Sequence, residues 1–244
     1  MPELCPPTVW VWTNIDQIPA AQLHSYTQDL SLSESIRLGN ISSEPRRREY
    51  IAGHRLLRTA LSSLDGQWQK THYLEHPLEQ PPSIVGPNSK ALNFNLSHSG
   101  NTLCCAVSPS HQLGIDIESP PKRYRSLQGI ADNYFSAKQA KDLSLLPVPQ
   151  QEKAFYRLWT LKESLIKANK SSIAEMGMAM EFTPLTSPHQ STWHSYFFTL
   201  NDCYCALTAS APLGRQLKVR EISTTHNTTA DKLITLGTPL ITSL

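Results

Sequence analysis

The stretch NTLCCAVSPS, residues 101–110, decides the fold because a similar stretch, NDCYCALTAS, occupies residues 201–210. The two stretches align without a gap, and asparagine, cysteine, alanine and serine occupy matching places. Each stretch also closes the same succession of expected elements: a strand, a loop, a long helix and a hairpin. Recurrence of a whole structural unit along a chain indicates internal duplication. We therefore expect a duplicated α+β unit whose two copies join near residue 112.

Hydrophobic patterns mark the elements of each expected copy. Alternating, β-branched and aromatic runs are typical of strands and hairpins, and a spacing of three to four residues is typical of helices. In the order strand, helix and hairpin, the expected elements are 8–15, 44–64 and 92–108 in the first copy, and 113–118, 151–169 and 192–210 in the second. Residues 65–90 are rich in proline and predict a loop with at most a short strand.

The predicted fold class is α+β. Two similar subdomains, residues 1–112 and 113–244, are expected to be related by a pseudo-twofold axis. Each is a small antiparallel sheet packed on a long helix. In addition, Ser136 is followed three residues later by Gln139, which is the pattern of a capping box and predicts a short helix at 136–147.

Composition and charge limit the possible partners. The 244 residues are 39% hydrophobic and 17% charged, with a formal net charge of +2. That mild excess, with one short basic cluster at 46–48, does not favour nucleic acid as a partner. No apolar run reaches the roughly 18–20 residues that span a bilayer. The first residues, MPELCPPTVW, lack the pattern of a signal peptide, so we expect a cytoplasmic protein without a membrane partner.

Four of the five cysteines lie in apolar, strand-like runs: Cys104, Cys105, Cys203 and Cys205. Their spacing matches no common zinc site, and no histidine is suitably placed beside them. We expect reduced, buried thiols.

Two isoleucines alternate with two acids in LGIDIE, residues 113–118. Residues two apart in a strand point to the same side, so Ile115 and Ile117 should face the core while Asp116 and Glu118 project together. Neighbouring carboxylates repel each other, and a divalent cation such as Mg²⁺ relieves that repulsion. A solvated outer strand face also explains an isolated acid pair, so both interpretations stay open on these residues alone.

The helix stretch LWTLKESLIKA, residues 158–168, carries a second candidate group. Trp159, Glu163 and Lys167 are four residues apart and share one helix face. Glu163 is a candidate third metal ligand or base, and Lys167 a candidate cation for phosphate. A surface Glu–Lys pair beside a core tryptophan is the alternative.

The stretch FNLSHSG, residues 94–100, is the third candidate. Ser97, His98 and the backbone N–H groups of such a turn can bind an anion, although a plain hairpin turn has the same pattern. A hydrolase nucleophile is disfavoured because adjacent strand residues point apart and no G-x-S-x-G stretch occurs.

Taken in order, FNLSHSG, LGIDIE and LWTLKESLIKA resemble the 4′-phosphopantetheinyl transferase superfamily. The length and the two-halved plan are similar to its longer, monomeric, surfactin-synthetase-activating type, and the resemblance covers most of residues 8–210. It implies transfer of phosphopantetheine from coenzyme A to a serine of an acyl or peptidyl carrier protein, with release of 3′,5′-ADP. It also implies a monomer that uses Mg²⁺, with Mn²⁺ as the alternative.

The resemblance assigns roles to individual residues. Asp116, Glu118 and Glu163 match the metal-binding acids, and Lys167 matches the lysine near the pyrophosphate. We expect Asp116, Glu163 and Lys167 to be catalytic, with Glu163 acting as ligand, base or both. The residues that match coenzyme-contacting positions are Ser97, His98, Lys162 and Lys167.

Two departures affect the predicted coenzyme contacts. The helix glycine, Gly53, is followed by His54 and then Arg55, whereas the family often has arginine directly after the glycine. The usual GKP before the SHS strand is also missing, and EQPPSI stands at residues 79–84. The basic contacts from this helix are therefore divided among Arg47, Arg48, His54 and Arg55.

Two other functions remain possible from the sequence. One is a Mg²⁺-dependent pyrophosphohydrolase that uses the same acids with water as acceptor. The other is a catalytically silent homologue that only binds carrier proteins. Whether the chain is a transferase or only a binding protein, its basic residues Lys122, Arg123 and Arg125 could steer an acidic carrier helix. A solvated loop also explains these charges.

Overall fold

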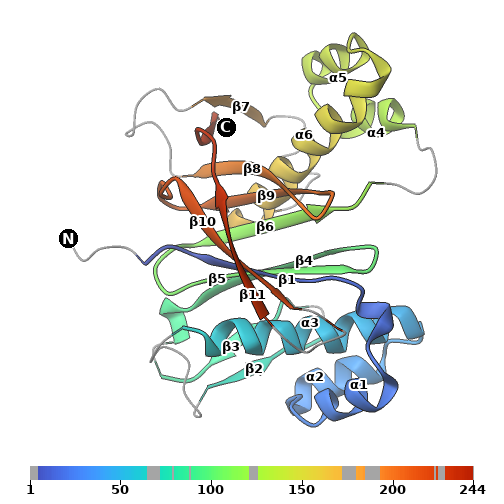
Figure 1. Cartoon of the computed structure of the whole chain (residues 1–244), viewed down its shortest axis with the longest axis vertical. Helices are drawn as coiled ribbons and strands as arrows, with labels where there is room; N and C mark the ends of the chain where they lie inside the picture. The colour runs from blue at the N-terminus through green and yellow to red at the C-terminus, as the bar shows by residue number, and fades with distance from the viewer. Residues whose placement is uncertain are drawn as a thin grey trace.

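The chain forms two five-stranded sheets that lie between two long helices, α3 (Glu44–Ser62) and α6 (Val148–Asn169), as the computed structural model in Figure 1 shows. This arrangement confirms the predicted α+β class. The residues that the structure describes are 5–64, 72–78, 80–87, 89–120, 126–171, 180–184, 193–222, 224 and 229–243.

The first sheet has the strand order β11-β10-β1-β5-β4 and combines segments from both ends of the chain. Its strands are β1 Thr8–Trp12, β4 Asn93–Ser99, β5 Thr102–Ser108, β10 Gln216–Ile222 and β11 Thr229–Thr235. Strand β1 pairs antiparallel with β5 but parallel with β10, so one pairing departs from the antiparallel pattern expected. Strands β10 and β11 thus cross the division predicted at residue 112 and cover an edge that β1 would otherwise expose.

The second sheet has the strand order β6-β9-β8-β12-β7, and its pairings are antiparallel. Its strands are β6 Leu113–Glu118, β7 Glu181–Pro184, β8 His194–Leu200, β9 Cys203–Ala209 and β12 Leu240–Ser243. The orders β1-β5-β4 and β6-β9-β8 correspond, and each group packs on its own long helix. The two similar subdomains expected from the sequence are therefore present.

The gapless alignment of the two copies is wrong by one residue. Val11 pairs with Cys104 in the first sheet, and Ile117 pairs with Cys205 in the second. Cys104 and Cys205 both lie in the core between the sheets, whereas Cys105, the aligned partner of Cys205, faces α3. A shift of one residue moves a strand side chain to the opposite face, so the structural match is offset from the identity match.

The main core lies between the two sheets and contains residues from strands of both, including Val9, Val11, Ile115 and Ile117. A second core joins the first sheet to α3. The equivalent places on the two strands therefore differ in chemistry: Trp10 and Trp12 of β1 pack toward α3, while their counterparts on β6 are acids.

A third core packs α4 (Leu127–Tyr134) and α5 (Ala137–Ser144) against α6. Ser136 accepts a hydrogen bond from the Gln139 N–H, and the Gln139 side chain accepts one from the Ser136 N–H. This capping box confirms the short helix predicted there.

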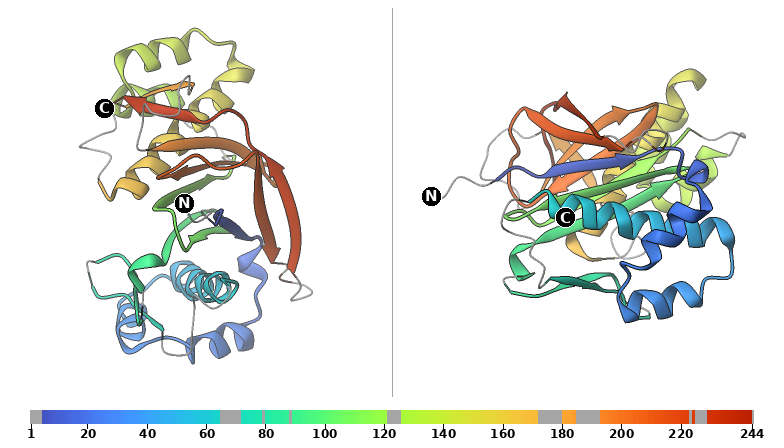
Figure 2. Two further views of the ribbon diagram at one scale, coloured as in Figure 1. Left: turned by 90° about the vertical axis from the view of Figure 1, so that its left-hand side faces the viewer. Right: turned by 60° about the horizontal axis from the view of Figure 1, so that its bottom comes forward.

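Several shorter elements surround α3. They are η1 Ile15–Gln17, α1 Ala20–Thr27, α2 Leu32–Gly39, β2 Tyr73–Glu75, β3 Ser83–Val85 and η2 Ser89–Ala91. Figure 2 shows α1 and α2 packed around α3 on the side away from the sheet. The stretch predicted as a loop with at most one strand contains two, β2 and β3. Each has three residues and is defined by pairing with the other, which local pattern does not reveal.

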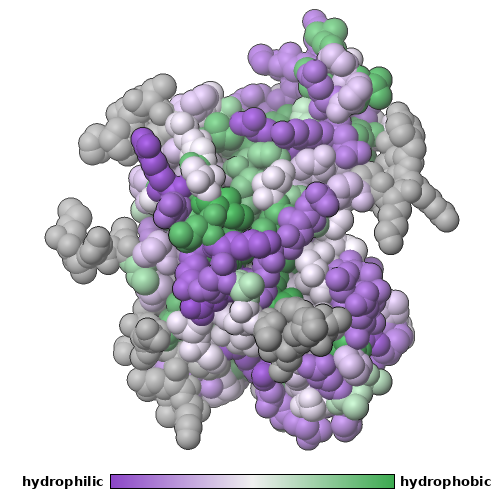
Figure 3. Space-filling view, viewed as in Figure 1, coloured by the Kyte–Doolittle hydropathy of each residue, from purple (hydrophilic) through white to green (hydrophobic). Residues whose placement is uncertain are grey.

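Charged side chains cover the outer strands of the first sheet. Figure 3 shows a hydrophilic surface over β10 and β11. Asp231 of β11 forms ion pairs with Lys218 and Arg220 of β10, and Lys232 pairs with Glu221. Such charges oppose further strand addition at an exposed edge.

All five cysteines are unpaired, and Cys5 alone is exposed. Burial raises the pKa values of Cys105 and Cys205 well above the ordinary thiol value, as expected for reduced, unreactive thiols. Among the described residues, no helix combines the length and apolar character needed to cross a bilayer.

Candidate active site

Asp116, the first acid of strand β6, is buried against helix α6. Asp116 is 4% exposed, and its Oδ1 atom lies 2.6 Å from the Lys167 Nζ atom. Ile115 and Ile117 point the other way, into the core between the sheets. Asp116 is therefore not part of a solvated outer strand face, and the alternation in LGIDIE separates a core side from a polar side.

A glycine allows α6 to lie directly on β6. A Cβ atom at Gly114 would lie 2.1 Å from the Ser164 carbonyl oxygen and 2.4 Å from the Ala168 nitrogen. No side chain fits at such distances, so the helix backbone rests on the strand backbone. Glu163 and Lys167 each immediately precede one of these contact residues, and the contact therefore sets both groups over the acid strand.

The two other acids lie within the electrostatic field of Asp116. Burial raises the pKa of Glu163, the charges of Asp116 and Glu118 raise it further, and Lys167 opposes them. Burial also raises the pKa of Glu118, which hydrogen bonds from Ser99 and Trp159 partly offset. The structure thus brings the three predicted acids and Lys167 into one region between β6 and α6.

Ser97 completes this group from strand β4. Its hydroxyl donates to Asp116 Oδ1 at 2.8 Å and accepts from Lys167 Nζ at 3.0 Å. The N–H of Ile117 also points at Ser97 Oγ, at 3.3 Å. The predicted serine of the SHS stretch therefore lies beside the acids.

The acids fit a hard divalent cation by their chemistry. Asp116 Oδ2 is buried and has no hydrogen-bond partner among the described residues, so an acceptor atom remains unsatisfied near two further carboxylates. Carboxylate oxygens are the protein ligands that Mg²⁺ prefers. Within the described part of the chain, however, no three Asp, Glu, His or Cys side chains already form a metal-ligand group. The cation bound to Asp116 here is the Lys167 ammonium.

Comparison with known proteins identifies the family. A family model for the 4′-phosphopantetheinyl transferase superfamily matches residues 112–219. The 4′-phosphopantetheinyl transferase HetI of Nostoc sp. is 31% identical over 210 residues, which cover 84% of this chain and 87% of HetI. The chain belongs to the 4′-phosphopantetheinyl transferase superfamily.

Other members of the superfamily match over shorter ranges. The 4′-phosphopantetheinyl transferase AcpT of Salmonella typhimurium is 33% identical over 136 residues, 52% of this chain and 61% of AcpT. A 4′-phosphopantetheinyl transferase of Bacillus subtilis is 43% identical over 76 residues, 31% of this chain and 32% of the relative. This phosphopantetheinyl transferase is thus a transferase enzyme, and its superfamily implies coenzyme A as a substrate.

The other predicted coenzyme contacts lie away from the acids. His98 points to the opposite side of β4 from Ser97, where its Nε2 atom lies 2.9 Å from Glu49 Oε1 of α3. Arg47 donates to the Leu38 carbonyl at 2.7 Å, and Arg48 donates to the Ile18 carbonyl at 2.6 Å. These two arginines tie α3 to the segments around it.

Arg55 is the third arginine among the predicted coenzyme contacts of α3. Its Nη1 atom lies 3.1 Å from Asp29 Oδ2, and its guanidinium lies 5.1 Å from the centre of the Tyr26 ring. About two-fifths of the Arg55 side chain is exposed, so a bound anion could compete with Asp29 for it.

His54 belongs to a buried network that the sequence analysis missed. Its Nδ1 atom lies 2.5 Å from Glu34 Oε1, and its Nε2 atom lies 3.1 Å from His76 Nδ1. Arg58 binds both Glu34 oxygens. Although burial opposes it, hydrogen bonds from His54, Arg58 and Ser31 hold the pKa of Glu34 at about 2. The predicted coenzyme contact of His54 stays a prediction that this buried position does not favour.

One part of this network, the capping box of α2, can be recognised in the sequence. Ser31 and Glu34 have its spacing, and the structure contains both of its hydrogen bonds. Sequence could not show that Glu34 also meets α3, because His54 lies 20 residues away and Arg58 lies 24.

Lys162 is separated from Lys167. It is fully buried, and its amine donates to the Met180 carbonyl at 3.2 Å and lies 5.5 Å from the centre of the Phe135 ring. Burial lowers the pKa of Lys162 to about 8. Its predicted coenzyme contact stays a prediction, and its position favours a role in packing α6 against Phe135, at the end of α4, and Met180, which precedes β7.

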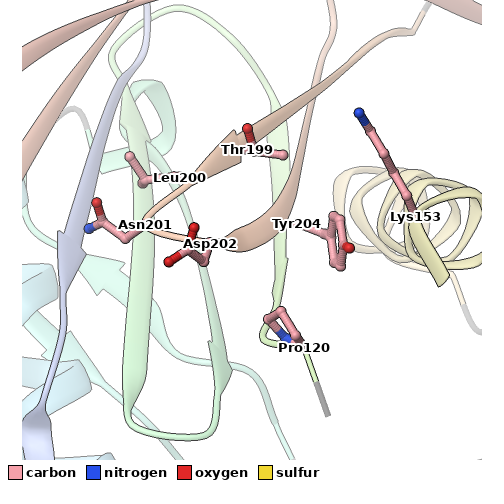
Figure 4. A pocket seen from close by; sticks show the side chains of 7 residues that line it. All are labelled: Pro120, Lys153, Thr199, Leu200, Asn201, Asp202 and Tyr204. Carbon is pink, nitrogen blue, oxygen red and sulfur yellow. The ribbon is translucent and has the colours of Figure 1, made fainter. Parts of the chain in front are cut away.

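A cavity of about 590 Å³ lies just beyond the acid strand. Figure 4 shows the Tyr204 ring between Pro120, which follows β6, and Lys153 of α6. Tyr204 is the cross-strand partner of Glu118, so the cavity adjoins the acid site without containing its acids.

The predicted carrier-steering residues Lys122, Arg123 and Arg125 lie outside the described residues.

Proposed function

We propose that this transferase moves the 4′-phosphopantetheine group of coenzyme A to a serine hydroxyl of an acyl or peptidyl carrier protein, with release of 3′,5′-ADP. The observation that carries the proposal is the buried Asp116. One of its carboxylate oxygens accepts hydrogen bonds from Lys167 and Ser97, and the other has no partner in the described part of the chain. HetI and AcpT, which are described as 4′-phosphopantetheinyl transferases, support the reaction class.

We assign the metal to Asp116, Glu118 and Glu163. Burial and the neighbouring carboxylates raise the pKa values of Glu118 and Glu163. A bound Mg²⁺ would neutralise these carboxylates together with the diphosphate of coenzyme A. Mn²⁺, with similar ligand preference, is the alternative.

Lys167 supplies a positive charge to the site. In phosphoryl transfer most of the catalysis comes from positioning and from neutralising charge. The Lys167 ammonium lies 2.6 Å from Asp116 Oδ1, and its side chain is 27% exposed. It is therefore placed to take up charge on the oxygen that leaves with 3′,5′-ADP.

Glu163 receives the proton of the attacking serine. The serine oxygen forms a bond to the β-phosphorus as the bond to the bridging oxygen breaks, and the serine proton passes to the carboxylate. A carboxylate whose pKa is raised holds a proton better at neutral pH than an ordinary one. Burial and the neighbouring acids raise the pKa of Glu163 in this way.

The nucleotide end of coenzyme A is assigned to β4 and α3. His98 and Arg55 are the most exposed of the predicted contacts, and each is paired with an acid that a phosphate could displace. Arg47 and Arg48 would have to give up backbone carbonyl contacts to bind it.

Mass spectrometry of several apo carrier proteins after incubation with enzyme, coenzyme A and Mg²⁺ tests the proposal. Wild type should add phosphopantetheine to at least one carrier, and Asp116→Ala should abolish the addition. Asp231→Ala, which removes an exposed acid of β11, is the matched control and should label normally. Labelling by Asp116→Ala at a near-wild-type rate contradicts the assignment, and cleavage of coenzyme A without carrier would instead indicate a pyrophosphohydrolase.

A further inference from the structure

The two sheets meet along a seam that side chains close. Strands β4 and β6 lie side by side in Figure 1 but belong to different sheets. Along β4, polar residues at every second position accept hydrogen bonds from backbone N–H groups of β6 and of Ser119, which follows it. The pairs are Asn95 with Ile115 at 3.0 Å, Ser97 with Ile117 at 3.3 Å and Ser99 with Ser119 at 3.0 Å.

The spacing of these bonds is regular, with 20 residues between acceptor and donor in each pair. The register between the two strands is therefore constant, and side chains of β4 satisfy N–H groups that would otherwise be buried without partners. Each of these polar side chains therefore has a structural reason to face β6.

The two serines make a second contact that the asparagine does not. Ser99 donates to Glu118 Oε2 at 2.8 Å, as Ser97 donates to Asp116 Oδ1. The corresponding place opposite Asn95 is Gly114, which has no side chain. A serine hydroxyl has one proton. Because its oxygen already accepts the backbone N–H, that proton is directed at the neighbouring carboxylate.

We propose that Ser99 is a positioning residue of the active site, whose hydroxyl, oriented by the Ser119 N–H, fixes the Glu118 carboxylate as Ser97 fixes Asp116. The proposal rests on the proposed function only in taking Asp116 and Glu118 as metal ligands. Residues that orient a metal ligand typically change metal affinity by about 10- to 100-fold when they are removed. Ser99 therefore acts on the metal through Glu118 and not by touching substrate.

Asn95 provides the matched control. Asn95→Ala and Ser99→Ala each remove one side-chain acceptor of the seam, but only Ser99→Ala removes a hydrogen bond to an acid. A purely structural role for Ser99 predicts equal effects of the two changes, whereas positioning predicts a difference in metal affinity. Ser99→Thr keeps the hydroxyl and should restore wild-type behaviour.

Mn²⁺ binding in the presence of coenzyme A, measured by electron paramagnetic resonance, separates these cases. We expect Ser99→Ala to weaken Mn²⁺ binding by about 10-fold or more. Asn95→Ala and Ser99→Thr should stay within about twofold of wild type. Denaturant unfolding of all three variants measures the stability of the seam. Both alanine variants should lose stability, and Ser99→Ala should lose more because it also removes the hydrogen bond to Glu118.

Equal Mn²⁺ affinities for Ser99→Ala and Asn95→Ala would overturn the proposal, as would a Ser99→Thr variant that binds as weakly as Ser99→Ala. If Ser99→Ala does not fold, Ser99→Cys replaces it, and wild-type Mn²⁺ affinity in that variant would also overturn the proposal. Failure of the proposed function looks different, because wild type itself would then neither bind Mn²⁺ with coenzyme A nor label a carrier.

Discussion

Replacing Gly114 by alanine should separate the helix that carries Glu163 and Lys167 from the strand that carries Asp116. The added Cβ atom would lie 2.1 Å from the Ser164 carbonyl oxygen, and 2.4 Å from the Ala168 nitrogen. Ordinary contact begins near 3.4 Å, so the helix must move by about 1 Å or more for attractive contact to be regained. Both obstructing atoms belong to backbone, and no side-chain rotation relieves the clash.

The expected cost follows from that displacement. Overpacking a well-packed interior costs about 1–3 kcal/mol, and a backbone obstruction should fall at the upper end, so we expect a loss of about 3 kcal/mol in the free energy of unfolding. The 2.6 Å contact between Lys167 and Asp116 would open, and a misplacement of about 1 Å at a reacting centre can lower the rate about 100-fold. Urea unfolding and the kcat/KM of carrier labelling measure the two effects.

Gly39→Ala is the matched control. Apart from its chain neighbours and the backbone of its own helix, no described atom lies within 4 Å of the Cβ position at Gly39, in α2. Alanine also favours a helix by up to about 1 kcal/mol over glycine. This variant should be at least as stable as wild type and equally active. If Gly114→Ala unfolds at the wild-type urea concentration and labels carrier at the wild-type rate, the close approach of β6 and α6 does not set the active site.

Two further predictions concern acids with shifted pKa values. Glu163→Gln should make the metal-free protein more stable at pH 7 while carrier labelling is lost, because burial and neighbouring acids raise the pKa of Glu163 and its charge then opposes folding. This gain should shrink as the pH falls through the raised pKa toward 4.5, since wild type also becomes neutral there; a variant less stable than wild type at pH 7 would contradict the reasoning. Glu34→Gln should lose about 3 kcal/mol at pH 7, because the pKa of Glu34 falls from 4.5 unfolded to about 2 folded. That advantage of the carboxylate exists above pH 4.5 and declines toward pH 2, so unfolding measured at pH 3 should show a smaller difference, and an equal difference at both pH values would argue against the network.

Local sequence patterns were sufficient to predict the repeated strands and helices and to predict which of their residues share a face. Alternation in LGIDIE separates Ile115 and Ile117 from Asp116 and Glu118, and helical spacing places Glu163 and Lys167 on one side of α6. Both follow from the geometry of a single strand or helix, so a sequence contains them directly. The capping box of Ser136 and Gln139 is local in the same sense.

Contacts between distant segments were beyond the sequence. Parallel pairing of β1 with β10 joins residues about 210 positions apart, and the Glu34 network joins α2 to α3. The gapless alignment of the repeats was wrong by one place, because identity does not reveal which face of a strand a cysteine occupies.

The sequence by itself determined which groups could bind a cation and phosphate, because those groups repeat with the period of the element that carries them. Only the tertiary structure decided that β4 reaches β6 through Ser97 and Ser99, that Gly114 lets α6 rest on the acid strand, and that Lys167 meets Asp116. The physical reason is that hydrogen bonds and close packing depend on distances between separate elements. Those distances are set by burial of the whole core and not by any one segment.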